Sequence, residues 1–336
     1  MRCEKVLIRR LITLAAWVVV ADFAAAQMPS PALLVVNKDE NAMAIVDPIA
    51  KKVVGSVRVG DGPHEVAASD DGKLAFVSNY GPGNATVPGS TISVIDLATK
   101  KELRKFEIGP NAKPHGVVFA GGKVYFTAEG FDMIGAYDPA SNKMDWMLGT
   151  GQDRTHVLVL NHDRTKIFAS NINSDSINIM ERVGNPPDWT STVVKVGKGP
   201  EAIDLSPDGK EVWTAHTADG AVSVIDVASK KVAHTLSLNM VRANRLKFTP
   251  DGKYVLITDA RGGKLLVLDA ATKKEVKRIA IGAGPTGIQM VPGNRQAIIA
   301  VSGDHMLAFF DLNKLEVTDR FSPGKNPDGM HWIAAE

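Results

Sequence analysis

Cysteine is nearly absent from this sequence. Its 336 residues include one cysteine, Cys3, which lies in the N-terminal segment ahead of every repeated motif described below. A chain with no second cysteine forms no internal disulfide and offers no thiolate cluster to a metal ion. We therefore expect core packing alone to hold the fold together.

An excess of charge of one sign is absent too. The chain has 39 Lys and Arg against 37 Asp and Glu, and the first 26 residues hold four of the basic and two of the acidic ones, so the remainder is formally neutral. A protein that binds nucleic acid normally has a basic excess, because release of counterions drives its affinity. No nucleic-acid partner is expected.

Long apolar segments and familiar catalytic motifs are missing as well. The apolar stretch Leu11–Val20 is far shorter than the ~20 residues that a membrane-spanning helix needs. Basic residues precede it and three alanines follow it, an order typical of a secretory signal peptide. We expect a leader at 1–26 and a mature domain at 27–336, periplasmic or extracellular, with no transmembrane segment. No Gly-x-Ser-x-Gly elbow, phosphate-binding loop or haem-attachment pair occurs.

What the sequence does contain is a repeat. The block "GDGPHEVAASDDGKLAFVSNYG…TISVIDLATKKELRKFEIG" runs from Gly60 to Gly109, and a later block reads "GPEAIDLSPDGKEVWTAHTADGAVSVIDVASKK". Seven such units follow one another at intervals of roughly 40–50 residues, a period typical of propeller blades. Each unit has four short runs in which apolar and polar residues alternate, with Asp-Gly pairs between runs. This pattern predicts four antiparallel strands.

The two ends of the chain complement one another. The mature sequence begins within a unit, at runs that match a second, third and fourth strand, and the missing first strand returns at Asp328–Ala334. One blade would then combine strands from both ends, which closes the ring and protects its edges. We therefore predict an all-β protein, a seven-bladed β-propeller of four-stranded antiparallel blades, closed by pairing of the N- and C-terminal strands in one blade.

Two segments, "VSNYG…TISVIDLATKK" and "TDARGGKLLVLDAATKK", closely resemble the YVTN-type β-propeller repeat of exported bacterial proteins. The resemblance covers nearly the whole mature chain and implies that the first strand of each blade lines a central channel. The residue after the first proline of a unit, or its equivalent, would open that strand. The unit around Asn244 departs from the pattern because it lacks the Gly-Pro start. Around the ring these residues are His64, His115, His156, Glu201, Asn244, Thr286 and Asp328.

The second strands should end at the same mouth of the channel, because first and second strands are antiparallel. We predict these ends at Asn37, Asn79, Glu129, Asn171, His216, Asp259 and Gly303. Three further residues near the mouth are candidates for substrate binding. Arg154 and Arg242 lie near first-strand starts and could bind an anionic group, and Tyr80 begins a loop rich in Gly and Pro that could act as a lid.

The imidazoles and carboxylates gathered at this mouth suggest a divalent metal ion. The candidate ligands are His115, His156, Glu129, Glu201 and His64. A set dominated by histidine would suit zinc or copper, and a set dominated by carboxylates would suit magnesium, manganese or calcium. The alternative is a polar channel whose side chains hydrogen-bond to water.

One unit carries a second resemblance. "KPHGVVFAGGKVYFTAEGFDMIGAYD" resembles a unit of the streptogramin B lyases, propeller enzymes that open a cyclic depsipeptide by metal-assisted elimination. The resemblance implies that His115 and Glu129 act as metal ligand and general base. Relative to that motif, Ala128 is an inserted residue. If the site is catalytic, His156 or His216 would accept a proton.

Two classes of function are therefore expected. The first is an exported binding scaffold whose channel face holds a small molecule, a metal ion or a protein partner. The second is a metal-dependent lyase or lactone hydrolase that uses the same site, with His156, His216 and Glu129 as catalytic residues. A quinone-dependent dehydrogenase has less support, because the long insertions expected of such an enzyme are missing.

Overall fold

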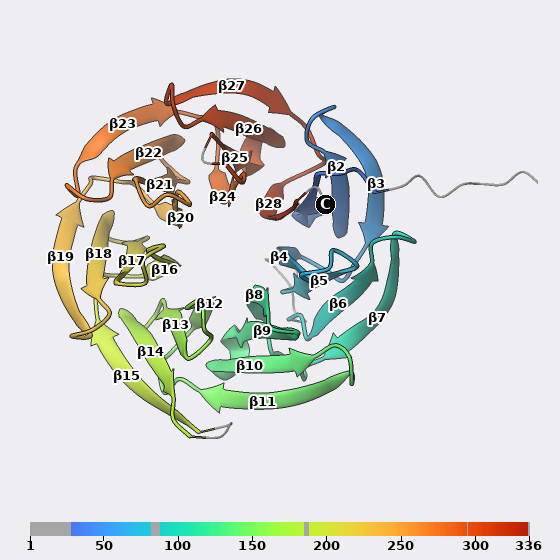
Figure 1. Ribbon diagram of the computed structural model, residues 1–336, viewed down its shortest axis with the longest axis horizontal. Coiled ribbons are helices and arrows are strands. Elements are labelled where there is room, and N and C mark those ends of the chain that lie inside the picture. The colour runs from blue at the N-terminus through green and yellow to red at the C-terminus, as the bar shows by residue number, and fades with distance from the viewer. Residues whose placement is uncertain (1–27, 82–87, 185–187, 294, 335–336) are drawn as a thin grey trace, which may run out of the picture.

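The computed structural model describes residues 28–81, 88–184, 188–293 and 295–334. The expected leader at 1–26 lies outside the described residues. Within them, seven four-stranded antiparallel sheets stand as blades around one axis (Figure 1). The prediction of an all-β, seven-bladed propeller is confirmed.

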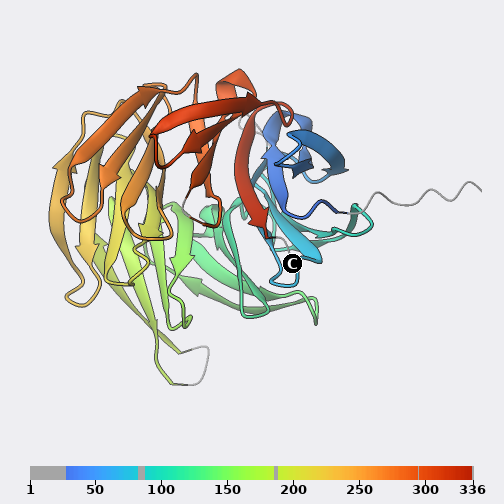
Figure 2. The ribbon, with the colours of Figure 1, turned by 45° about the horizontal axis from the view of Figure 1, so that its top comes forward.

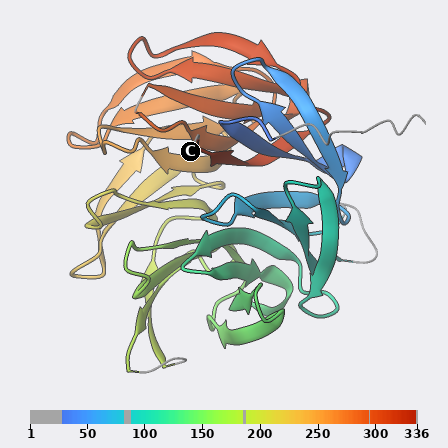
Figure 3. The ribbon, with the colours of Figure 1, turned by 45° about the vertical axis from the view of Figure 1, so that its right-hand side comes forward.

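Each blade runs from an innermost first strand to an outermost fourth strand, as the tilted views in Figure 2 and Figure 3 show. The first three blades after the closing one are β4 (Pro63–Ala68), β5 (Leu74–Asn79), β6 (Thr91–Asp96) and β7 (Lys101–Glu107); β8 (Pro114–Ala120), β9 (Lys123–Ala128), β10 (Met133–Asp138) and β11 (Lys143–Gly149); and β12 (Thr155–Leu160), β13 (Lys166–Asn171), β14 (Ser176–Arg182) and β15 (Trp189–Lys195).

The next three blades are β16 (Pro200–Leu205), β17 (Glu211–His216), β18 (Ala221–Asp226) and β19 (Lys231–Ser237); β20 (Ala243–Phe248), β21 (Tyr254–Asp259), β22 (Lys264–Asp269) and β23 (Glu275–Ala280); and β24 (Pro285–Met290), β25 (Gln296–Val301), β26 (Met306–Asp311) and β27 (Glu316–Phe321). Three single-turn 3-10 helices follow second strands: η1 (Lys38–Glu40), η2 (Glu129–Phe131) and η3 (Ser302–Asp304).

The seventh blade joins the two ends of the described chain. It combines β28 (Pro327–Ile333) with β1 (Ala32–Asn37), β2 (Ala42–Asp47) and β3 (Lys52–Arg58). β1 and β28 are antiparallel, with Leu34 opposite His331 and Val35 opposite Met330. Figure 1 shows these blue and red strands side by side. The predicted closure is therefore confirmed, and β28 covers the inner edge of β1, which the N-terminal strands alone would leave unpaired.

Strands in the interior of a blade are more buried than the outermost strand at the rim. The sequence LAFVSN of β5 is buried on both faces, since neighbouring blades cover it on each side. The sequence KELRKFE of β7 alternates exposed and covered residues, because one face of an outermost strand meets solvent. The alternation that signalled strands in the sequence is thus clearest at the rim.

Apolar side chains between blades form the core. Between the blades of β4 and β8, Phe76, Phe126 and Tyr137 are fully buried in one cluster. The ring of Phe106 stacks on that of Tyr137, with centroids 3.9 Å apart. Full burial of a phenylalanine side chain contributes about 1.5–3 kcal/mol relative to an exposed one, so packing between blades stabilises the fold. In the described part of the chain, no helix has the length and hydropathy to cross a membrane.

Hydroxyl groups on the second strands of four blades bond to the first strand of the next blade. The Ser78 hydroxyl donates to the carbonyl of His115 at 2.7 Å, and the Thr127 hydroxyl donates to the carbonyl of His156 at 2.5 Å. Ser170 makes the same bond to the carbonyl of Glu201 at 3.2 Å. These bonds fix the backbone of the residues that face the channel.

Candidate functional site

The second residues of the seven innermost strands form a ring at one mouth of the channel. In each blade the first residue of the innermost strand lies opposite the end of the second strand, as Pro63 lies opposite Asn79 and Ala243 opposite Asp259. Asn244 therefore takes the equivalent place even though its unit lacks the Gly-Pro start. All seven predicted residues line one cavity of about 190 Å³, here called the mouth cavity: His64, His115, His156, Glu201, Asn244, Thr286 and Asp328.

A buried ion pair separates the mouth cavity from the rest of the channel. Arg245 on β20 is paired with Glu65 on β4, on the other side of the axis (Figure 1). A second cavity of about 340 Å³ has mostly aliphatic walls, among them Leu158 and Ile288. Arg245 lines both cavities, so the pair stands between the mouth cavity and this second cavity.

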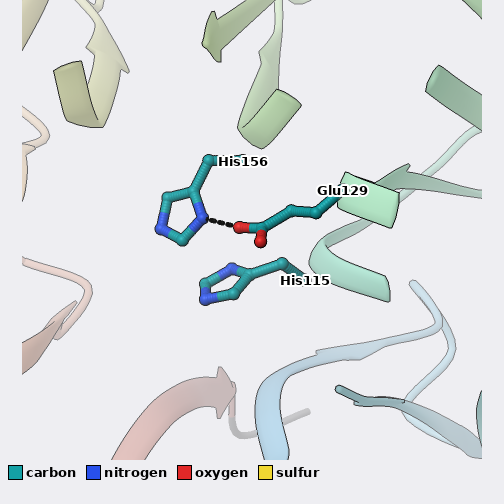
Figure 4. A group of neighbouring side chains, drawn as sticks. All are labelled: His115, Glu129 and His156. Atoms are coloured by element: carbon teal, nitrogen blue, oxygen red, sulfur yellow. Dashed lines mark hydrogen bonds and ion pairs between the residues drawn. The ribbon is translucent and has the colours of Figure 1, made fainter. Parts of the chain in front are cut away.

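Three side chains at one side of the mouth cavity come close enough to share a metal ion. Each of His115, Glu129 and His156 offers a ligand atom, and the three atoms lie within 4.8 Å of one another (Figure 4). The three residues are at most 7% exposed. The imidazoles of His115 and His156 have centroids 3.8 Å apart. Among the described residues, this is the group of three or more potential ligands whose atoms lie this close together. Its members come from β8, η2 and β12.

Glu129 is the centre of the hydrogen bonds in this group. Its carboxylate accepts from Nδ1 of His156, from the Tyr80 hydroxyl at 2.6 Å and from Nε of Arg154 at 3.4 Å. Burial alone would raise the pKa of Glu129, but the His156 imidazole, the Tyr80 hydroxyl and Arg154 lower it to about 2. An ionised carboxylate only accepts, so Nδ1 of His156 carries a proton, and in the neutral form of the ring Nε2 is the nitrogen that can act as an acceptor or ligand.

His115 has an unused nitrogen. Its Nδ1 is buried and makes no hydrogen bond to the described protein atoms. Burial, followed by the neighbouring His156 and His64, lowers the pKa of His115 well below its usual range. A neutral imidazole with a free lone pair is the form that binds metal ions. The donor set and this orphaned nitrogen fit a divalent ion.

The predicted second-strand ends need a correction. The residues opposite the first-strand starts are Ala128 in the blade of β9 and Val301 in the blade of β25, so Glu129 and Gly303 lie beyond the strand ends. The strand-end ring is therefore Asn37, Asn79, Ala128, Asn171, His216, Asp259 and Val301.

The strand-end ring does not surround the cavity, contrary to the prediction. Its members are at most 2% exposed, and none of them lines the mouth cavity. Their polar side chains hold neighbouring turns instead. Asn79 donates to Thr91 and Ser93, and Asp259 accepts from the backbone of Val241 and Arg242.

The residue one place later has the opposite role. Lys38, Tyr80 and Glu129 each follow a strand end, and their backbone N–H groups donate to the equivalent residues Asn326, Gly62 and Lys113. Because successive residues of an extended chain point to opposite sides, this shift by one residue turns the side chain toward the channel. Lys38 and Tyr80 line the mouth cavity, and Glu129 lies directly behind Tyr80 and His156.

Arg154 has a left-handed backbone, as Lys113 and Asn326 have at the equivalent places. It precedes β12, at the place where three other blades have Gly62, Gly199 and Gly284, and its φ of 60° is left-handed like theirs. Glycine adopts this conformation without strain, whereas other residues do so at a cost. Here that conformation accompanies the contact of Arg154 with Glu129. Arg242 has the equivalent place before β20 and pairs with Glu201 at 2.9 Å.

Other predicted site residues lie apart from the three-residue group. Glu201 lines the mouth cavity but is held by Arg242 and Asn244. His64 lines it too; its Nδ1 bonds to the Gly62 carbonyl at 2.8 Å, and its ring centroid is 4.9 Å from that of His115. His216 has no exposed surface, and its Nδ1 lies 3.0 Å from Asp219. The structure does not bring His216 to the cavity.

Sequence reasoning missed Lys38, Glu65 and Arg245. Lys38 could have been found by placing it in register with Glu129. The signal for the other two is a charged residue at the third position of a first strand, where Gly287 and Gly329 stand in other blades. At Gly287 a Cβ would lie 2.2 Å from the carbonyl oxygen of Asp328, so neighbouring first strands approach too closely there for most side chains.

Fold and site together define a seven-bladed β-propeller with a polar, histidine-containing site at the channel mouth. Residues 119–295 match the YNCE-like β-propeller family, and the chain belongs to this family. No curated protein sequence matches the chain.

Solved structures share the fold at low sequence identity. A putative 6-phosphogluconolactonase from Bacteroides uniformis superposes with a TM-score of 0.74 at 15% identity, over 90% of this chain and 99% of the other. The periplasmic gluconolactonase of Pseudomonas aeruginosa gives 0.71 at 17% identity, over 91% and 99%. Hydrazine synthase of Kuenenia stuttgartiensis gives 0.68 at 18% identity, over 79% and 88%. At such identities the likeness establishes the fold alone.

Proposed function

We propose that this propeller is a binding scaffold that holds a divalent metal ion in its mouth cavity, with His115, Glu129 and His156 as ligands. The observation that carries the proposal is the meeting of three buried ligand atoms within 4.8 Å, one from a histidine whose Nδ1 has no protein partner. Two imidazoles and a carboxylate are a donor set that favours zinc over magnesium or calcium. The bound ion would supply a Lewis acid and an anchor for a ligand oxygen.

The residues around the group support this proposal by holding the ligands in place. Tyr80 and Arg154 orient the Glu129 carboxylate from the side away from His156. Hydrogen bonds to the ligands from such outer residues commonly tune metal affinity. The hydroxyls of Ser78 and Thr127 fix the backbones of the two histidines. A small molecule would bind from the cavity side, next to the half-exposed Arg154.

We further propose export to the periplasm or the exterior. The order of basic residues, apolar run and alanines in the first 26 residues supports it, as does the resemblance of the repeats to the YVTN type. Detection of the mature N-terminus in the periplasmic or extracellular fraction by mass spectrometry would test it, and an unprocessed cytoplasmic chain would refute it.

Titration of untagged, chelator-stripped protein with Zn²⁺ tests the metal site. We expect one ion per chain by calorimetry and by elemental analysis after dialysis. The His115→Ala variant should lose this binding, because it removes one of the three buried ligands. His234→Ala is the matched control, since His234 is an exposed residue of the outermost strand β19.

Two outcomes would refute the metal site. One is a folded wild-type protein that binds less than a stoichiometric amount of Zn²⁺, Cu²⁺, Mn²⁺, Mg²⁺ and Ca²⁺ tested in turn. The other is a His115→Ala variant that binds the ion as tightly as the wild type does. Circular dichroism and thermal unfolding of each variant show whether the propeller is intact.

A second candidate is metal-dependent lactone hydrolysis, with elimination of the streptogramin B lyase type as its variant. His64 favours it: with Nδ1 bonded to the Gly62 carbonyl, its other nitrogen has a free lone pair beside the three-residue group. The names of two similar structures, a putative 6-phosphogluconolactonase and a gluconolactonase, suggest the substrate. Zinc-loaded protein should hydrolyse δ-gluconolactone above the buffer rate, and His64→Gln should lower that rate about 100-fold while it retains zinc. If zinc-loaded wild-type protein hydrolysed the lactone no faster than buffer alone, this second candidate function would be refuted.

A further inference from the structure

We infer that the ligand of the mouth cavity is a small hydroxylated carboxylate of the sugar-acid type, with its carboxylate toward the three-residue group and its hydroxyls toward Asn244 and Asp328. This inference rests on the proposed metal site for the position of the carboxylate. The hydroxyl side rests on separate observations.

The charge of the cavity calls for an anion. Four cationic side chains line it, and each is already paired with a carboxylate: Lys38 with Asp328, Arg154 with Glu129, Arg242 with Glu201, and Arg245 with Glu65. A divalent ion would add two positive charges that no further carboxylate in this set balances. Uncompensated charge is costly in a site removed from bulk water, so the ligand that completes the site should be negatively charged.

The opposite wall calls for hydrogen-bond donors. Oδ1 of Asp328 is buried and has no partner, while its Oδ2 accepts from Lys38 at 2.8 Å. Oδ1 of Asn244 is likewise buried and unpartnered. Its orientation is fixed because Nδ2 donates to the Glu201 carboxylate, which can only accept. Buried acceptors are normally satisfied, and both of these belong to residues that line the cavity.

The proposed carboxylate site and the two unpartnered acceptors lie on opposite sides of the mouth cavity. His115 and His156 are on β8 and β12, whereas Asn244 and Asp328 are on β20 and β28, across the axis (Figure 1). The cavity of about 190 Å³ is smaller than the ~300–1,000 Å³ of pockets for drug-sized ligands. A compact molecule with a carboxylate at one end and hydroxyls at the other satisfies both walls.

Calorimetric titrations of the zinc-loaded, untagged protein test this inference. The probes are D-gluconate, hexanoate, which has the carboxylate without hydroxyls, sorbitol, which has hydroxyls without the carboxylate, and inorganic phosphate. We expect gluconate to bind at least 10-fold more tightly than each of the other three. Two hydrogen bonds to orphaned acceptors at about 1 kcal/mol each correspond to a factor of this size.

A substitution on the hydroxyl side separates this inference from the metal site. Asn244→Leu keeps the shape and leaves Glu201 with Arg242, so zinc affinity should stay unchanged while gluconate affinity falls about 5-fold, the share of one hydrogen bond. Asn313→Leu, in an exposed outer turn, is the matched control and should bind as the wild type does. Asp328→Asn gives an independent second variant with the same expectation.

Each failure has a distinct meaning. If zinc binds but gluconate and hexanoate bind equally, or Asn244→Leu and Asp328→Asn leave gluconate affinity unchanged, then water satisfies the orphaned acceptors and the inference is wrong while the metal site stands. If phosphate binds as tightly as gluconate, the site selects charge alone and the inference is again wrong. If no metal binds, both the proposed function and the carboxylate assignment fail.

Discussion

Two sets of residues, one place apart in the sequence of each blade, have different roles: one stabilises the framework and the other contributes to the site. The strand-end ring, from Asn37 to Val301, is buried, and its polar members hydrogen-bond neighbouring strands and loops. From the next-residue ring, Lys38 and Tyr80 line the channel mouth and Glu129 joins the three-residue group. In each repeat, two neighbouring positions therefore have different surroundings. A side chain at the first position stabilises the framework, and a side chain at the second can take part in the site.

The largest effect should come from breaking the strand-end ring. Asp259→Ala removes the carboxylate that accepts from the backbone N–H groups of Val241 and Arg242, both part-buried. Hydrogen bonds to a carboxylate contribute about 1.5–3 kcal/mol each, so we expect the free energy of unfolding to fall by about 3 kcal/mol in urea titrations. The adjacent Ala260→Ser should change it little. An Asp259→Ala protein as stable as the wild type would contradict the framework role of this ring.

Glu129→Gln tests the next-residue ring. The substitution keeps the shape but removes the charge that binds the ion, so we expect zinc affinity to fall at least 100-fold, or about 2.7 kcal/mol. Calorimetry measures this loss, and thermal unfolding checks the fold. If Glu129→Gln bound zinc normally, Glu129 would only orient His156.

Tyr80→Phe should have a smaller effect of the same kind. It removes the 2.6 Å hydrogen bond to Glu129 and nothing else from the side chain. Loss of such an outer contact typically lowers metal affinity about 10-fold, which competition with a zinc-binding dye can resolve. Asn79→Ala, one residue earlier, should lower stability and leave zinc affinity unchanged. The reverse result would show that the two rings had been assigned the wrong way round.

The smallest effect concerns pH. Burial lowers the pKa of His216, although Asp219 opposes the shift. Below about pH 6.5, the ordinary value, the unfolded chain binds a proton that the folded chain refuses, so stability falls as the pH drops. His216→Asn introduces the residue that three other blades have at this place. The variant should lose less stability than the wild type as the pH drops, and the difference should be less than about 1.4 kcal/mol per pH unit. Urea midpoints at pH 7.5 and 5.5 test it. If the wild type and His216→Asn lost the same stability between these pH values, the pH dependence would come from other groups.

The ring of first-strand residues could be predicted because the repeat carries its own markers. A proline or its equivalent opens each first strand, and Asp-Gly turns separate the runs, so equivalent positions can be counted along the chain. Even Asn244, in the irregular unit, takes the expected place. Local turn chemistry and alternation act within a few residues, and these are the forces that sequence patterns report well.

The second-strand residues could not be predicted in the same way. The residue opposite the start of β8 is Ala128, and only backbone pairing reveals that Glu129 lies in the following 3-10 turn. Gly130 permits that turn, since a Cβ there would lie 1.8 Å from the Asn111 carbonyl oxygen. Grouping Glu129 with His216 therefore joined a residue of the site to a residue of the framework.

The sequence by itself determined the number of blades, the closure of the ring and the seven side chains that open toward one channel mouth, because a repeated pattern imposes the same local structure each time. Only the tertiary structure decided which of these side chains meet. The group of His115, Glu129 and His156 and the ion pair of Glu65 with Arg245 depend on contacts between blades, and a difference of one residue in register changes such contacts while leaving the repeat intact.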